Sequence, residues 1–126
     1  MRAMVPIGRA LFALLFITSI IGHFSSSTIA YATAHGVPLA TLVVPLTGIV
    51  AFLGGAMVLI GYRARFGAFL LFVFLVPVTI VMHRFWGIPD PTVAAMQQAA
   101  FMKNLALIGT TLLIMFYGSG PVSLDD

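Results

Sequence analysis

The chain has 126 residues, of which 61% are hydrophobic and 7% are charged. Because an ordinary soluble domain carries about 25% charged residues, this composition excludes a domain whose whole surface faces water. The net charge of +3 comes from dispersed basic residues, which do not indicate a nucleic-acid surface. The absence of cysteine excludes disulfides, thiolate metal sites and dithiol redox chemistry within the chain.

Four apolar runs dominate the sequence. A helix needs about 20 apolar residues to cross a bilayer core about 30 Å thick. Runs of this kind nearly fill the chain, at residues 7–24, 39–60, 66–82 and 99–116. They predict an all-α fold, a transmembrane four-helix bundle that forms a single domain over residues 1–126.

The first apolar run follows Arg2 and contains Arg9 as its only charge. A basic start, an apolar middle and the Ala-x-Ala sites at residues 30–32 and 32–34 are also typical of a secretory signal peptide. The length of the run and the three later spans favour a retained span over a cleaved peptide. The connection that follows, residues 25–37, is expected to contain a brief helix at the membrane interface.

The second and third spans are expected to form an antiparallel hairpin, because only residues 61–65 separate them. Pro38 is expected to be the first residue of the second span, where proline is favoured. Pro45 and Pro77 lie within the two spans. Since proline removes a backbone donor from a helix, each span is expected to bend.

Small residues recur three and four positions apart on one face of the second span: Gly48, Ala51 and Gly55. Such a face lets another helix approach closely, so it predicts helix packing within the membrane. Close approach to a flat ligand is the alternative interpretation.

The last helix is expected to begin near Thr92. Asp90 followed by Pro91 resembles an N-cap with proline at the first helical position. The early residues of this helix, including Gln97 and Gln98, are expected to lie in the interface before the apolar run starts.

Basic residues are unevenly divided between the two ends of the spans. One end has Arg2, Arg9, Arg63 and Arg65, and the other has Arg84 and Lys103. Because the end richer in Lys and Arg faces the cytoplasm, both termini are predicted to be cytoplasmic (N-in/C-in), in a plasma (inner) membrane. By the same alternation the histidines fall toward the external end: His23, His35 and His83.

Lys103 and Asn104 lie inside the last apolar run. An ionised side chain at the bilayer centre costs roughly 2.5–3.5 kcal/mol on insertion scales. If the hydrocarbon begins at Ala99, Lys103 is about one turn inside and its stem snorkels outward. If the helix enters the hydrocarbon from Thr92, the lysine needs a partner or water. The sequence leaves both interpretations open.

Polar side chains from three spans fall at this external level. They are His23, His83, Arg84, Trp86, Gln97, Lys103 and Asn104. They predict a donor-rich pocket beneath the tryptophan that binds a quinone carbonyl, an anionic headgroup or an oxyanion, because Lys and Arg supply charge and His exchanges protons near neutral pH. The alternative is a set of interfacial residues that face lipid headgroups. No metal site is predicted, since the histidines lack thiolate partners and tight ligand spacing.

A series of short motifs runs in order through nearly the whole chain. They are Gly8-Arg9, Tyr31, Gly36-Val37-Pro38, Pro45-Leu46, Gly54-Gly55, Gly61 with Arg63 and Arg65, His83 with Phe85-Trp86, Phe101 with Lys103-Asn104-Leu105, and residues 118–124. With these motifs the sequence resembles the DoxX family of small four-helix membrane proteins. The resemblance implies that the first span is retained and that four positions are characteristic: His83, Trp86, Lys103 and Asn104.

The resemblance also implies a role near membrane redox chemistry, because the family's name comes from a small subunit of an archaeal thiosulfate:quinone oxidoreductase. Many relatives look as though they carry a glutamate shortly before the Gly-Gly pair of the second span, where this chain has Ala51. That departure argues against transfer of the thiosulfate activity itself.

The expected function is therefore that of a subunit or accessory component of a quinone-linked membrane redox system, in which this chain binds and orients while a cofactor or partner supplies the chemistry. Quinone is the expected cofactor, and none is expected to be bound covalently. The expected partners are membrane lipid and either further copies of the chain or another membrane or redox subunit, with no nucleic acid. A non-catalytic scaffold and a small oligomeric transporter are the alternatives. The sequence identifies no catalytic residue and leaves open whether the chain is an enzyme.

Overall fold

The computed structural model describes residues 2–125, and this part of the chain contains five α-helices. They are α1 (Met4–His23), α2 (Ser26–Ala34), α3 (Ala40–Ile60), α4 (Ala64–Met82) and α5 (Pro91–Tyr117). All except α2 are long and apolar enough to cross a membrane. The predicted all-α fold is confirmed, and four of the helices are candidate membrane spans. The cytoplasmic placement of the termini stays a prediction.

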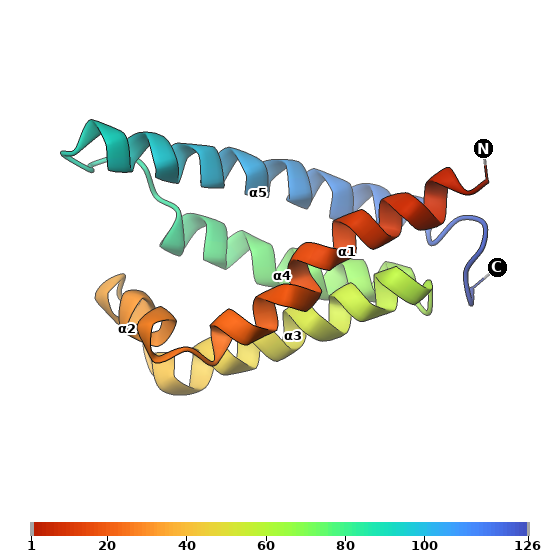
Figure 1. Ribbon diagram of the computed structural model, residues 1–126, viewed down its shortest axis with the longest axis horizontal. Coiled ribbons are helices and arrows are strands. Elements are labelled where there is room, and N and C mark those ends of the chain that lie inside the picture. The colour runs from red at the N-terminus through yellow and green to blue at the C-terminus, as the bar shows by residue number, and fades with distance from the viewer. Residues whose placement is uncertain (1, 126) are drawn as a thin grey trace.

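The four long helices pack in a row, α1 against α3, α3 against α4 and α4 against α5. In Figure 1, α5 lies alongside α4, whereas α1 crosses α3 obliquely. The start of α1 and the end of α5 lie at the same end of the molecule, and the short α2 lies at the opposite end (Figure 1). The two ends of the chain lie together because, with an even number of long helices, the chain returns to the side on which it began.

The interior is small and lies where α1, α3 and α4 meet. Its buried members are Phe16, Ala51, Val58, Ala68, Leu71 and Leu75. Many other large apolar side chains point outward, such as Leu42, which is 65% exposed, and Leu113, which is 60% exposed. An apolar surface of this extent indicates that lipid rather than water surrounds the long helices.

The small face of α3 packs against α1. A Cβ atom added at Gly48 would lie 2.4 Å from the Cβ of His23, and one added at Gly55 would lie 3.1 Å from the Cβ of Phe16. The absence of side chains therefore lets the two helices approach closely. The prediction that this face packs against a helix is confirmed.

The start of α5 is as predicted. Oδ1 of Asp90 accepts a hydrogen bond from Thr92 N at 2.9 Å, and Pro91 is the first helical residue. The helix then continues without a break for 27 residues, so residues 92–98 and the apolar run form one element.

The start of α3 differs from the prediction, which placed Pro38 at the first position. The helix begins at Ala40, because Leu39 has a φ of 52° and this left-handed conformation separates the proline from the helix. Pro45 and Pro77 lie inside α3 and α4 as predicted. The predicted brief helix after the first span is present as α2.

The residues after α5 fold back over the turn between α3 and α4, and residues 118–125 are called the tail segment below. Leu124 N donates to Ile60 O at 3.2 Å, and Asp125 N donates to Gly61 O at 2.9 Å. Gly61 ends α3 with a φ of 72°, which favours glycine. The tail segment is thereby attached to the end of the hairpin.

Arg9 links α1 to the same tail segment. Its side chain is 6% exposed, and its Nη2 donates to the backbone oxygen of Val122. Within residues 2–125, its Nε and Nη1 atoms are buried without a hydrogen-bond partner. The position of Arg9 in the sequence indicates topology, and the structure adds that its side chain joins the first span to the tail segment.

Candidate functional site

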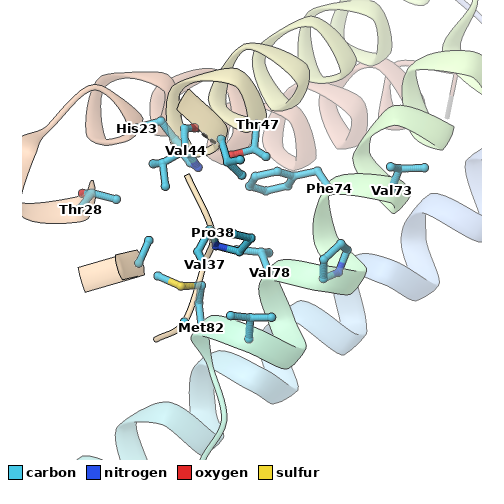
Figure 2. Close-up of a pocket in the computed structure, with 15 residues that line it drawn as sticks. His23, Thr28, Val37, Pro38, Val44, Thr47, Val73, Phe74, Val78 and Met82 are labelled. Carbon is cyan, nitrogen blue, oxygen red and sulfur yellow. Dashed lines mark hydrogen bonds between the residues drawn. The ribbon is translucent and has the colours of Figure 1, made fainter. Parts of the chain in front are cut away.

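An apolar cavity of about 310 Å³ lies between the end of α1, α2 with the loop that follows it, α3 and α4. We call it the histidine cavity. Figure 2 shows His23 on one wall and Val78 and Met82 on the α4 wall, with Val37 and Pro38 from the loop between them. Most of the lining is aliphatic, so the cavity suits a lipophilic molecule.

His23 is the titratable group in this lining. Its Nδ1 lies 2.8 Å from the backbone oxygen of Ser19. A carbonyl oxygen only accepts, so Nδ1 carries the proton and donates. In the neutral ring Nε2 is then an acceptor, and within the described part of the chain it has no second hydrogen bond. The ring also meets Phe74, with the centroids 5.6 Å apart.

Two hydroxyl groups complete the polar lining, from Thr28 on α2 and Thr47 on α3. Thr47 Oγ1 donates to Val44 O at 2.8 Å, the bond drawn dashed in Figure 2, so its proton is already used. The cavity therefore offers a ligand few polar contacts, and the histidine is the strongest of them.

Helix α2 covers one side of the cavity and is tied to α4 and α5 by a set of side chains that we call the Tyr31 latch. Gln97 Nε2 donates to Tyr31 Oη at 2.8 Å, and Gln97 Oε1 accepts from His83 Nδ1 at 3.0 Å. Tyr31 Oη in turn lies 3.5 Å from Met82 O. Because Ala32, the next residue on α2, is buried and lines the cavity, the latch fixes the cavity wall.

The seven predicted pocket residues are distributed over different surroundings. His83 and Gln97 are joined by a hydrogen bond, and His23 lines the histidine cavity. Asn104 is buried, Lys103 and Arg84 are exposed, and Trp86 is 53% exposed and packs against Phe85 and Phe101. Sequence reasoning missed Tyr31 as a partner of Gln97, because the two are 66 positions apart and no local pattern links them.

A second cavity, of about 560 Å³, lies at the other end of the bundle, and we call it the tail cavity. Its lining includes Arg63, Arg65, Ser119 and Asp125. The hydroxyl of Ser119 donates to the Asp125 carboxylate at 2.6 Å, and the backbone N–H groups of Ala64 and Arg63 donate at 3.0 and 2.8 Å. These bonds, in that order, lower the pKa of Asp125, with a smaller effect from the charge of Arg65.

The sequence was compared with protein families and with curated proteins. The profile described as the SURF4 family matches residues 2–126. "Inner membrane protein YqjF" of Escherichia coli (strain K12) is 30% identical over 123 residues, which cover 96% of this chain and 88% of that protein. "Surfeit locus protein 4 homolog" of Schizosaccharomyces pombe (strain 972 / ATCC 24843) is 29% identical over 72 residues, which cover 56% of this chain and 24% of that protein. No solved structure matches.

The family match overturns the resemblance to the DoxX family, which was wrong. The motifs behind it have general causes in a small membrane bundle. Gly54-Gly55 lies where helices approach closely, the basic residues mark the ends of spans, and the His-aromatic group lies where a span ends. The redox expectation depended on that resemblance and has no support from the relatives that match.

Proposed function

This chain belongs to the SURF4 family, and from that premise we propose that it is a multi-pass inner-membrane protein whose histidine cavity holds one lipophilic molecule with a hydroxyl group. The observation that carries the proposal is a single ring acceptor, Nε2 of His23, at the wall of an otherwise apolar cavity. The family match supports the class of protein, and the lining of the cavity supports the chemistry of the ligand.

The size of the cavity limits the ligand. A volume of about 310 Å³ is at the lower end of the range of roughly 300–1,000 Å³ for small-molecule sites. One isoprenoid or acyl segment fits this volume better than a phospholipid with two chains. The valines and Met82 would then bury the chain, and burial of apolar surface would supply most of the affinity.

The polar end of the ligand follows from the tautomer of His23. Because Nδ1 donates to Ser19 O, the neutral ring accepts at Nε2 and suits a donor. A long-chain alcohol or a quinol carries such a donor, whereas the carbonyl of a quinone does not. The proposed ligand class, a lipophilic hydroxyl compound, therefore differs from the quinone expected from the sequence. The proposal includes no electron transfer.

Placement in the membrane is part of the proposal. The name of the Escherichia coli relative supports an inner membrane. The four arginines at the tail end of the bundle, against Arg84 and Lys103, support cytoplasmic termini. The histidine cavity would then lie toward the external leaflet.

A membrane partner is a second proposal, supported by Lys103. This residue is exposed and lies 12 positions after the start of the 27-residue α5, hence about 18 Å along the helix. The described carboxylates, Asp90 and Asp125, lie beyond the two ends of α5. A carboxylate from a neighbouring membrane protein or a second copy would neutralise the lysine. Photocrosslinking from Ala99 in native membranes should capture that neighbour, and Lys103→Met should abolish the crosslink.

The ligand proposal is tested with a photoreactive long-chain alcohol and its methyl ether, added to the protein in nanodiscs. The alcohol should label residues of the cavity wall, and the ether, which lacks the donor, should label them several-fold less. Val78→Phe fills the cavity and should abolish this labelling. Leu53→Phe, on a surface 50% exposed to lipid, is the matched control and should not. Equal labelling by alcohol and ether, or labelling that survives Val78→Phe, would refute the proposal.

A further inference from the structure

The tail cavity carries an independent inference, because it joins two cationic side chains to an apolar surface. Arg63 and Arg65 both line it, and so do Phe66 and Tyr117. Phe66 is 53% exposed and Tyr117 is 71% exposed. A ligand in this cavity would therefore contact both guanidinium groups and aromatic rings.

The carboxylate in the cavity forms its hydrogen bonds with other donors and not with these guanidinium groups. Both oxygens of Asp125 are engaged, Oδ1 by Arg63 N and Oδ2 by Ala64 N and Ser119 Oγ. Asp125 thus caps the first N–H groups of α4, where a negative charge is favoured. Neither guanidinium forms a salt bridge with the described residues.

The guanidinium groups are held but retain free donors. Arg65 Nη2 donates to Phe116 O at 3.2 Å. The Arg65 guanidinium also packs closely on Gly118, since a Cβ added to that glycine would lie 3.3 Å from Arg65 Nε. Arg63 lies over the ring of Tyr62, with its Cζ 5.7 Å from the centroid. Each arginine has five N–H donors, so several remain for a ligand. Paired guanidinium donors match the oxygens of a phosphate group.

We propose that the tail cavity binds the phosphate group of an anionic lipid, with Arg63 and Arg65 as donors and Phe66 and Tyr117 beside the start of the lipid chains. The phosphate group accounts for the two cations. The exposed rings, which continue into the lipid-facing surface of α4 and α5, select a lipid over free phosphate. The site uses no residue of the histidine cavity and does not depend on the function proposed above.

The test measures lipid retention by native mass spectrometry. The protein is first reconstituted in phosphatidylcholine vesicles that contain about 20% phosphatidylglycerol, which gives the membrane an anionic surface. The wild-type protein should retain phosphatidylglycerol in preference to phosphatidylcholine. Arg63→Gln should reduce the retention about tenfold, since a charge-assisted hydrogen bond is lost. Arg63 makes no side-chain hydrogen bond to the described residues, so this variant should fold. Arg65→Gln should reduce retention similarly if it folds.

Arg84→Gln is the matched control, because Arg84 is an exposed arginine at the other end of the bundle. It should retain phosphatidylglycerol as the wild type does. Equal retention by Arg63→Gln and the wild type, or an equal loss in Arg84→Gln, would overturn the proposal. Displacement of the lipid by millimolar inorganic phosphate would overturn the choice of a lipid over free phosphate.

Discussion

The contact between Gly48 and His23 gives the sharpest prediction about the fold and the histidine cavity together. In Gly48→Ala, the new Cβ would lie 2.4 Å from the Cβ and 2.7 Å from the Cγ of His23. Non-bonded carbon atoms prefer about 3.5–4.0 Å, so the end of α1 must move away from α3 by about 1 Å. Overpacking of this kind costs roughly 1–3 kcal/mol.

The displaced residue is the one that presents the acceptor to the cavity. Gly48→Ala should therefore lower the unfolding free energy by that amount and also weaken labelling of the cavity by the photoreactive alcohol. Unfolding in a mixed detergent and SDS titration measures the first effect. Gly109→Ala is the matched control, since a Cβ added there meets nothing within 4 Å. It should be neutral or slightly stabilising, because alanine favours helices.

His23→Gly combined with Gly48→Ala removes the Cβ that clashes, whereas His23→Ala keeps it. The combined glycine variant should recover most of the lost stability without recovering alcohol labelling. Two results would contradict the close approach of α1 and α3: a Gly48→Ala variant as stable as the wild type, or a rescue by His23→Ala equal to that by His23→Gly.

Three further outcomes are expected. Gln97→Leu removes the two hydrogen bonds that Gln97 makes in the Tyr31 latch, so amide hydrogen exchange in α2 should become faster. Gln98→Leu, at an exposed position, should leave the exchange unchanged, and equal exchange in both variants would contradict the latch. The folded-state pKa of Asp125 lies below its ordinary value of 3.8, so its contribution to stability is complete above about pH 3.8 and is lost as the pH falls through the folded pKa. The amide proton of Ala64, followed by NMR, should shift in that acidic range and in Asp125→Asn should not, and a midpoint above 3.8 would contradict the sign. Lys103→Met should leave the stability of the isolated protein unchanged or raise it, because the lysine is exposed and a charge in hydrocarbon is costly. A clear loss of stability would instead reveal a partner of Lys103 within the chain.

The spans were predictable because hydrophobic length alone determines them. A run of about 20 apolar residues has few alternatives in a chain with so little charge. Asp90 and Pro91 were predictable for a similar reason, since the N-cap acts on residues only two and three positions away. The start of α3 was not, because the left-handed conformation of Leu39 depends on how the loop crosses the end of the bundle.

The candidate sites show where local reasoning stops. Sequence reasoning placed His83 and Gln97 at one level, and they do share a hydrogen bond, but it gave no sign of Tyr31. Asp125 caps α4, a helix that begins 61 positions earlier, and no local pattern indicates this contact. These contacts depend on the packing of distant segments, which periodicity and spacing do not encode.

Arg9 and Lys103 show the same limit for charge. Both entered the count that predicts topology, and that count does not depend on depth or partners. In the structure Arg9 is 6% exposed and contacts the tail segment, whereas Lys103 is exposed on the outer face of α5. Residues with equal weight in a topology rule can therefore have different roles.

The most direct test of the proposed ligand chemistry is the side-chain ¹⁵N NMR spectrum of His23 in nanodiscs, recorded with the long-chain alcohol and with its methyl ether. The contact with Ser19 predicts a ring that carries a proton on Nδ1. The alcohol should then shift the Nε2 resonance toward that of a hydrogen-bonded nitrogen, and the ether should leave it unchanged. A ring protonated at Nε2 alone, or identical spectra with the two compounds, would contradict a hydroxyl ligand at His23.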